Sequence, residues 1–359
     1  MFRVRSLTLH LPLEPGEVAD PYRVLDEAWR RLNAIKAALR EAGFSVWSLR
    51  VSFAPAEDLD AARLGAVAEA AKPYGEDLLV SLIHTACSDP GVEAVSSILP
   101  RAGNVYASLR ADSAAECYKC FHRALVRLGR HASRLALLFT EHLQTPYFPA
   151  ACSLGGEECI SVALLYPRLV ESRGFNGVRE AGELAYRLEK VVREAAEDAG
   201  VGYCGIDASL SPWMSESVTA ALEATAGRPI YSYGFALTVK RVNDAIMEYI
   251  CSRVKCIGFN EAMLAVAEDD RLKEHAASGR LTLDTLIHLL YVCVAGLDMV
   301  AIQQPKPEVT RAILEEAEAA RLVKGRTVGV RLIYAPPGAR TIYIDDVIGS
   351  TPVIAYRAA

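Results

Sequence analysis

The stretch that decides the fold class consists of FRVRSLTLHL (residues 2–11), DPYRVLDEAWRRLNAIKAALREAG (20–43) and FSVWSLRVSF (44–53). The first and last of these segments are strand-like. In the middle segment Asp20 can cap a helix that has Pro21 at its first position, and apolar residues then recur every three or four positions. A strand, a helix and a second strand in this order predict an α/β architecture with a buried sheet.

The same alternation continues through most of the chain, with helices dominating between the strand at 202–207 and residue 295. The other expected elements are strands at 77–84, 104–109 and 134–139, helices at 113–128, 177–199 and 305–324, and a proline- and glycine-rich loop at 144–158. The last three strands, at 327–334, 340–345 and 351–356, are joined by short turns that predict an antiparallel meander and hence a mixed sheet. Since no linker divides the chain, a single domain over residues 1–359 is predicted.

The composition excludes several classes of protein. Of 359 residues, 52% are hydrophobic, and the net charge of -5 comes from interspersed acids and bases without the basic stripe that nucleic acid requires. The longest apolar run, 286–302, is interrupted by His288 and Asp298 and is too short to cross a membrane. Nine scattered cysteines favour a reducing compartment and predict a cytoplasmic protein, with disulfides left as an alternative.

Two carboxylates follow or interrupt apolar segments. Asp298 lies within VAGLDMVAI, just after Gly296, which should end the preceding helix. Asp207 follows the strand-like GYCGI, and a polar residue just past the carboxyl end of a strand is well placed for a ligand. Each acid has an alternative explanation as an acceptor of backbone hydrogen bonds at a tight turn.

A denser group of acids is formed by Glu268, Asp269 and Asp270. Three acids are unfavourable at the end of a helix, so they are expected at the start of the next one. Asp269 is predicted to cap a helix over 270–277, with metal or proton chemistry as the alternative.

The cysteines offer two kinds of candidate site. Cys117 and Cys120 form a C-x-x-C beside His122, but their spacing also suits the core face of a helix, and zinc needs four ligands. Cys152 lies in the loop near His142 and is either an accessible thiolate or a buried loop cysteine. Walker-type and Gly-x-Ser-x-Gly motifs do not occur in the sequence.

Several segments together resemble the uncharacterised family called domain of unknown function 711, whose fold resembles the pyruvate formate-lyase-like barrel. The segments that carry the resemblance are FRVRSLTLHL, TPYFPAA, GIDASLSP followed by SES, VND, GFNEAMLAVAEDD, CVAGLDMVAI and IGSTPV. Within GFNEAMLAVAEDD the chain departs from the family pattern at Glu261 and Ala265, where relatives commonly have a glycine and a proline.

The resemblance implies an α/β barrel of about ten strands surrounded by helices, with a mixed sheet and with residues 147–152 approaching its interior. The residues at family motif positions are Asp207, Ser209, Pro212, Ser217, Asn243, Asp244, Asn260, Glu268, Asp269 and Asp298. Related radical enzymes need a glycine in an arginine-containing C-terminal motif, which YIDDVIGSTPVIAYRAA lacks before Gly349. The chain is therefore expected to be a radical-free relative of that fold, and fold similarity does not transfer the lyase activity.

These observations lead to a hypothesis of an enzyme that acts on a small polar metabolite in a barrel cavity. Self-association as a homo-oligomer is also expected. The catalytic candidates are Asp298, Asp207 and Glu268; the substrate-binding candidates are Tyr147, Cys152, Ser209, Asn243 and Asn260; and Asp269 is the candidate ligand of a divalent metal such as Mg²⁺ or Ca²⁺. The alternative is a non-catalytic small-molecule-binding or regulatory protein. A glycyl-radical enzyme is a third hypothesis.

Overall fold

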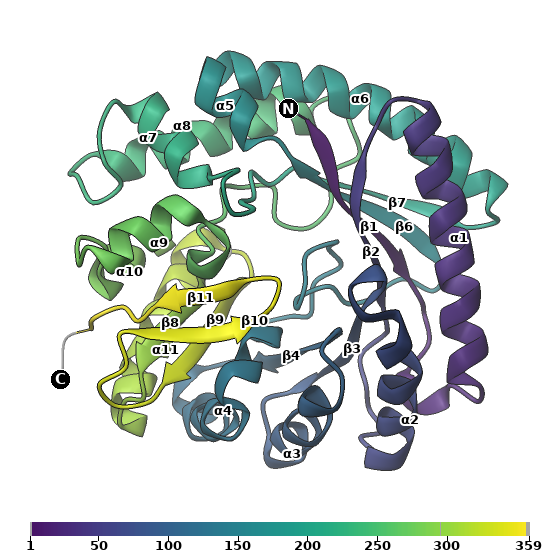
Figure 1. Cartoon of the computed structure of the whole chain (residues 1–359), viewed down its shortest axis with the longest axis horizontal. Helices are drawn as coiled ribbons and strands as arrows, with labels where there is room; N and C mark the ends of the chain where they lie inside the picture. Colours follow the sequence, from purple (N-terminus) through teal and green to yellow (C-terminus); the bar gives the residue numbers. More distant parts are fainter. Residues whose placement is uncertain (1, 295, 357–359) are drawn as a thin grey trace.

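The computed structural model describes residues 2–294 and 296–356 and is built around a nine-stranded sheet with helices on its outside (Figure 1). The strands in spatial order are β7 (Gly202–Asp207), β6 (Cys159–Leu165), β1 (Arg3–His10), β2 (Val46–Ser52), β3 (Leu79–Ala86), β4 (Val105–Ala111), β5 (Leu135–Phe139), β9 (Val328–Ala335) and β8 (Leu297–Gln303). β1 to β5 are parallel, whereas β6 and β9 pair with them in the antiparallel sense. The predicted α/β class and mixed sheet are confirmed.

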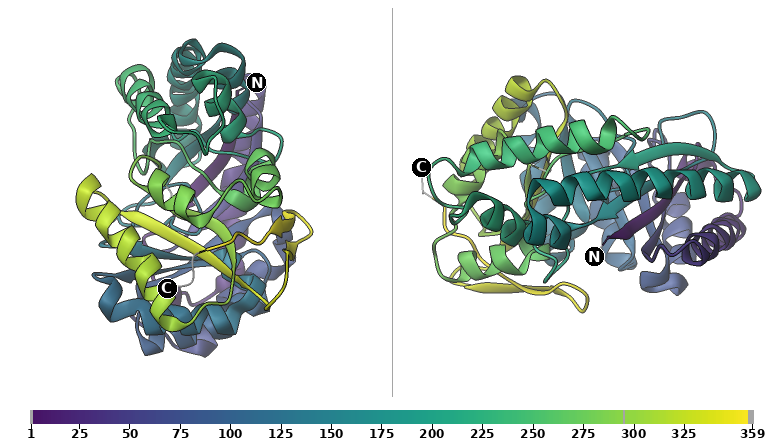
Figure 2. Two further views of the ribbon diagram at one scale, coloured as in Figure 1. Left: turned by 90° about the vertical axis from the view of Figure 1, so that its left-hand side faces the viewer. Right: turned by 90° about the horizontal axis from the view of Figure 1, so that it is seen from above.

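The helices follow the apolar periodicity of the sequence. They are α1 (Pro21–Glu41), α2 (Ala61–Ala71), α3 (Asp89–Ile98), α4 (Ala114–Leu128), α5 (Pro167–Arg173), α6 (Phe175–Asp198), α7 (Val218–Ala226), α8 (Phe235–Ile246), α9 (Asp270–Ala277), α10 (Leu283–Leu290) and α11 (Pro307–Lys324). The predicted cap is confirmed, because the Asp20 side chain accepts a hydrogen bond from the backbone N–H of Arg23. The long helices α6 and α8 lie side by side over one side of the sheet (Figure 2). None of the described helices combines the length and apolar character of a membrane span.

The two faces of the sheet differ in polarity. On β1, Leu7 and Leu9 belong to the large apolar core beneath the helices. The alternate residues Ser6 and Thr8 face the interior, where both hydroxyls donate to the carbonyl oxygen of Pro146, at 3.3 and 3.4 Å. The loop between β5 and β6 therefore rests on a polar inner face of the sheet, on the side away from the outer helices in Figure 1.

Segment 256–269 lies between the two outermost strands, β7 and β8. Isolated bridges join Ile206 to Cys256 and Leu210 to Ala262 on one side, and Ala265 to Asp298 on the other. Gly258 permits this close approach, because its φ is +74° and a Cβ there would lie 2.2 Å from Oδ2 of Asp207.

Two details of the strand prediction are wrong. β9 joins the main sheet between β5 and β8, so only β10 (Thr341–Asp345) and β11 (Gly349–Pro352) form the final antiparallel pair. The sequence interpretation also missed β6 and β8, which are short apolar segments without strict alternation. Residues 286–302 contain both a helix and a strand, and periodicity does not separate these within one apolar run.

The cysteines are partly paired. Disulfides join Cys159 to Cys204, across neighbouring strands β6 and β7, and Cys251 to Cys256. Four of the nine cysteines are therefore in disulfides, the alternative to free thiols that the sequence left open. Cys117 is buried in the core, as its helical spacing predicts, and its C-x-x-C partner Cys120 faces Asp89.

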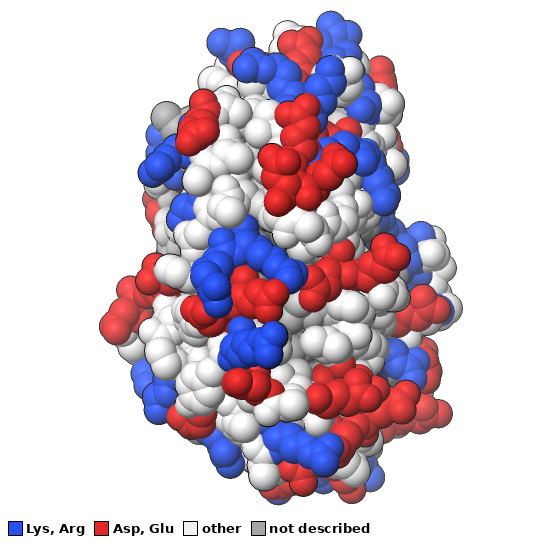
Figure 3. Space-filling view, turned by 90° about the vertical axis from the view of Figure 1, so that its right-hand side faces the viewer, with Lys and Arg blue, Asp and Glu red and all other residues white. Residues whose placement is uncertain are grey.

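The face shown in Figure 3 carries basic and acidic side chains side by side. Surface ion pairs such as Arg30–Asp26 on α1 account for part of this mixture. The interspersed charge expected from the sequence is therefore present on this face.

Candidate functional site

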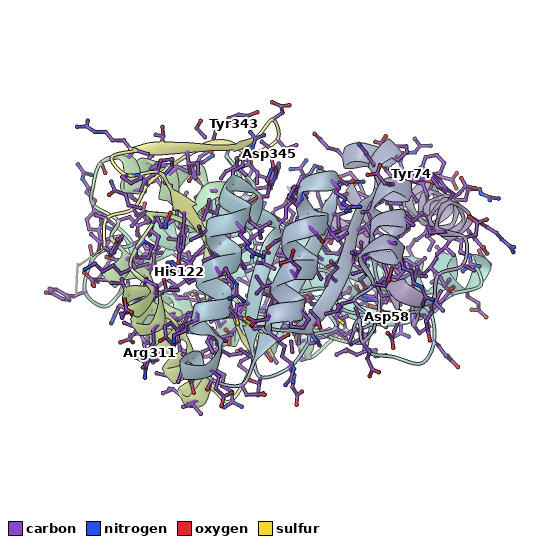
Figure 4. The ribbon with its side chains drawn as sticks, turned by 90° about the horizontal axis from the view of Figure 1, so that it is seen from below. Asp58, Tyr74, His122, Arg311, Tyr343 and Asp345 are labelled. Atoms are coloured by element: carbon purple, nitrogen blue, oxygen red, sulfur yellow. A yellow bond between two sulfur atoms is a disulfide. The ribbon has the colours of Figure 1, made fainter. Side chains whose placement is uncertain are left out.

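A cavity of about 600 Å³ opens between the inner face of the sheet, the loop after β5 and the β10–β11 hairpin. Its volume lies within the range of small-molecule sites. Asp345 belongs to the hairpin at its mouth, where Figure 4 shows this residue beside Tyr343. The aromatic side chains that line the cavity are Trp47, Tyr106, Tyr147, Phe148, Trp213 and Phe259.

A chain of buried ion pairs crosses the cavity wall. Nη2 of Arg5 donates to Glu268 at 2.6 Å, and Nη2 of Arg331 donates to the other oxygen of Glu268 at 2.9 Å. Nε of Arg331 also donates to Asp298. Two guanidiniums and two carboxylates thus form one network in which Arg331 lies between the acids, and charge-assisted bonds of this kind hold their partners in a fixed geometry.

The local structure explains how these groups meet. Arg5 lies on β1 and Arg331 on β9, two strands that are not neighbours in the sheet. The bridge between Ala265 and Asp298 brings the segment that carries Glu268 beside β8. The network therefore links four parts of the chain across the interior: β1, β8, β9 and segment 256–269.

The two cavity carboxylates are in different electrostatic states. Burial disfavours the charged form of Glu268, but the guanidiniums of Arg331 and Arg5 outweigh it and lower its pKa. For Asp298 the effect of burial is larger than the opposing effect of the Arg331 guanidinium, so the pKa of Asp298 is raised. Two carboxyl groups whose pKa values are displaced in opposite directions suit one ionised role and one proton-exchanging role.

Two further arginines line the cavity without a carboxylate partner among the described residues. Arg50 donates from Nε to Ser48 at 3.0 Å and from Nη1 to the Pro146 carbonyl at 3.1 Å, and it lies 5.0 Å from the Phe148 ring. Arg134 donates to the carbonyls of Ala102 and Val105.

The charge of the cavity interior is therefore unbalanced. The residues Arg5, Arg50, Arg134 and Arg331 are each at most 7% exposed, and the acids that lie among them are Glu268 and Asp298. The other charged lining residues are more exposed and lie at the rim: Lys72, Glu76, Asp345 and Asp346. Burial and the neighbouring Arg5 lower the pKa of Arg50 to about 10, which leaves it charged at neutral pH. The interior carries an excess of positive charge and is electrostatically suited to an anion.

Asp207 lies outside the cavity lining and is saturated with hydrogen bonds. Its oxygens accept from the side chains of Thr145 and Ser209 at 2.8 and 2.6 Å. They also accept from the backbone N–H groups of Ser209, Phe259 and Asn260. Burial is the largest influence on its pKa and raises it, and the hydrogen bonds oppose this. The structure places Ser209 and Asn260 in this same cluster.

Asp269 caps α9, as its position in the sequence predicts. Its carboxylate accepts from the backbone N–H groups of Arg271 and Leu272, and also from Ser217 and Thr219 of the α7 start. Both oxygens are engaged in these bonds.

The remaining candidates are divided between the cavity and the surrounding structure. Tyr147 lines the cavity, and its hydroxyl lies 3.4 Å from the carbonyls of Leu164 and Ser209. Asn243 instead ties α8 to the backbone, donating to Val292 and accepting from Ala262. Cys152 is fully buried at one end of the cavity loop. Of the eight candidate binding and catalytic residues, the cavity brings together Asp298, Glu268 and Tyr147.

The sequence interpretation did not identify the cavity arginines. A signal was present, since arginines interrupt strand-like segments in FRVRSLTL, WSLRVSF and VGVRLIY. An arginine in the middle of a buried strand needs a partner or a ligand. Recognising that these strands converge on one cavity required the fold.

The fold and site define an α/β protein with an arginine-rich cavity of metabolite size. The chain matches the family described as Uncharacterised ACR (DUF711) over residues 2–340, and it belongs to this family. It is 30% identical over 232 residues to a UPF0210 protein of Pyrobaculum aerophilum, covering 60% of this chain and 52% of that one.

Other similar proteins come from distant organisms. A UPF0210 protein of Methanocaldococcus jannaschii is 29% identical over 185 residues, covering 49% of this chain and 40% of the relative. A UPF0210 protein of Streptococcus equi subsp. zooepidemicus is 31% identical over 166 residues, covering 45% of this chain and 37% of the relative. The chain spans about half the length, or less, of these curated relatives, whose names specify no reaction or ligand.

Proposed function

We propose that the cavity binds a small anionic metabolite and that the protein is an enzyme that moves a proton on it. The observation that carries the proposal is Arg50, a buried and charged side chain in the cavity wall with no carboxylate partner among the described residues. A buried charge without a partner is costly, and a ligand carboxylate or phosphate would supply the missing partner. The aromatic walls favour an anion with an apolar or planar part.

The family resemblance and the bridges from segment 256–269 to the edge strands support a barrel architecture around the cavity. Segment 256–269 contacts β7 on one side and β8 on the other, and a strand in this place would close the nine-stranded sheet into a ring of about ten. We propose that the sheet is a pyruvate formate-lyase-like barrel that works without a glycyl radical.

Acid/base chemistry is favoured over a divalent metal in this cavity. Arg331 lies between Glu268 and Asp298 and bonds to both, in the position that a cation bridging the two carboxylates would take. Mg²⁺ or Ca²⁺ would have to displace this guanidinium. Asp298, with its raised pKa, is the proposed proton acceptor, whereas Glu268 keeps Arg5 and Arg331 in place.

The charge requirement predicts which compounds stabilise the protein. Phenylacetate, succinate and phenyl phosphate are compared with the neutral analogues phenylacetamide and succinamide in thermal unfolding. At about 100 times Kd a ligand of the folded state adds about 2.7 kcal/mol, so at least one anion is expected to raise the Tm by several degrees and neither amide to do so. Equal shifts of the Tm by the anions and by the neutral amides would exclude the proposed anion site.

A non-catalytic binding protein is the second candidate function. It is favoured by the hydrogen bonds from Arg331 to both cavity acids, which occupy the carboxylates that an enzyme would use. Deuterium exchange of carbon-bound ligand protons in D₂O, followed by NMR, separates the two functions. An enzyme exchanges them, and Asp298→Asn is expected to slow exchange about 100-fold or more while binding persists. Asp112→Asn is the matched control, because Asp112 is an exposed aspartate outside the cavity lining.

The pH dependence of exchange has a defined sign. A base must be ionised, so the rate falls as the pH drops through the Asp298 pKa, which lies higher than for an ordinary aspartate because the side chain is buried. Binding without exchange by the wild type at every pH would instead identify a binding protein.

A further inference from the structure

A cluster of two histidines and one cysteine lies at the neck of the cavity loop. His84 is on β3, and His142 and Cys152 lie at the two ends of the loop that crosses the interior. The loop ends are held together by a bridge between Leu143 and Ala151 and by a 3.0 Å bond from the N–H of Cys152 to the carbonyl of Leu143. The candidate ligand atoms of the three side chains all lie within 4.8 Å of one another.

The ring nitrogens of this cluster have unfilled bonding capacity. Nδ1 of His84 lies 2.7 Å from the Ser108 hydroxyl, which leaves Nε2 as its free nitrogen. This Nε2 and Nδ1 of His142 are both buried and have no hydrogen-bond partner among the described residues. His84 itself is fully buried. Orphaned buried polar atoms are rare in folded proteins, and two that face one cluster call for a shared explanation.

We propose that His84, His142 and Cys152 form a zinc site. Two imidazoles and a thiolate are borderline-soft ligands, which suit Zn²⁺ and not the hard cations Mg²⁺ or Ca²⁺. Cys152 binds as the thiolate and releases its proton to solvent, and a water molecule completes the tetrahedron. The bond between Ser108 and Nδ1 of His84 orients that ring in the manner of an outer-shell partner.

The site is separate from the proposed anion cavity, since none of its three residues belongs to the cavity lining. Its place in the fold nevertheless gives it a structural consequence. The loop between His142 and Cys152 carries Tyr147 and Phe148, which form part of the cavity wall. An ion that joins both loop ends to β3 would fix this wall in place.

The test uses the full chain, stripped with a chelator and titrated with Zn²⁺ and, separately, with Co²⁺. One Zn²⁺ per chain is expected, and the Co²⁺ form should show a thiolate-to-cobalt charge-transfer absorption. Cys152→Ala should remove this absorption and weaken Zn²⁺ binding about 100-fold or more, since even outer-shell changes cost about 10–100-fold. His142→Gln should weaken binding similarly. The control is Cys293→Ala, which removes another buried free thiol.

The wild-type cobalt spectrum makes the result independent of how well the variants fold. No stoichiometric Zn²⁺ binding, a cobalt spectrum without thiolate absorption, or wild-type affinity in folded Cys152→Ala would each overturn the proposal. Loss of the absorption in Cys152→Ala but not in Cys293→Ala supports it.

Discussion

Replacing Asp207 by alanine is expected to lower the free energy of unfolding by about 5 kcal/mol or more, which equals the whole stability of a protein at the lower end of the usual range. The fully buried carboxylate joins three segments: the end of β7, the cavity loop through Thr145, and segment 256–269 through Phe259 and Asn260. Without it, three buried backbone N–H groups lose their acceptor, at about 1–3 kcal/mol each.

Urea denaturation followed by circular dichroism measures this loss. Asp207→Asn keeps one acceptor oxygen and should fall between the wild type and Asp207→Ala. Asp244→Ala is the matched control, because Asp244 is also an aspartate at a family motif position but lies exposed on α8 beside Lys240. Wild-type stability in Asp207→Ala, with only ligand-dependent behaviour changed, would contradict a structural role and favour the catalytic one.

Local signals in the sequence predicted much of the fold. Asp20 and Asp269 were identifiable as helix caps because capping depends on residues within one turn. β6 and β8 were missed because their short apolar segments match both a buried strand and a piece of helix. The place of β9 in the main sheet was also missed, since strand pairing at long range leaves no local pattern.

The candidate site was less predictable for the same reason. Glu268 and Asp298 could be singled out as acids near apolar segments, but Arg5 and Glu268 are 263 positions apart in sequence. Asp207 carries a similar local signal and yet lies in a hydrogen-bonded cluster outside the cavity. Sequence alone does not separate a carboxylate that holds segments together from one that lines a cavity.

Replacing Arg50 by methionine is expected to weaken anion binding about 100-fold without destabilising the unliganded protein. A hydrogen bond to a charged group contributes about 1.5–3 kcal/mol, and 2.7 kcal/mol corresponds to a factor of about 100. The carbonyl of Pro146 keeps the hydroxyls of Ser6 and Thr8 as donors when the guanidinium is removed. Since a buried charge without a carboxylate partner is lost, the unliganded variant should be as stable as the wild type, or more so.

Isothermal titration calorimetry with the most stabilising anion tests the central claim directly. The wild type is compared with Arg50→Met and with the surface control Arg63→Met. Arg63 pairs with the exposed Asp58, which is labelled in Figure 4. We expect one site per chain in the wild type and in Arg63→Met, and binding about 100-fold weaker in Arg50→Met. Equal affinity in all three proteins, or no binding of any anion by the wild type, would contradict an anion-binding cavity centred on Arg50.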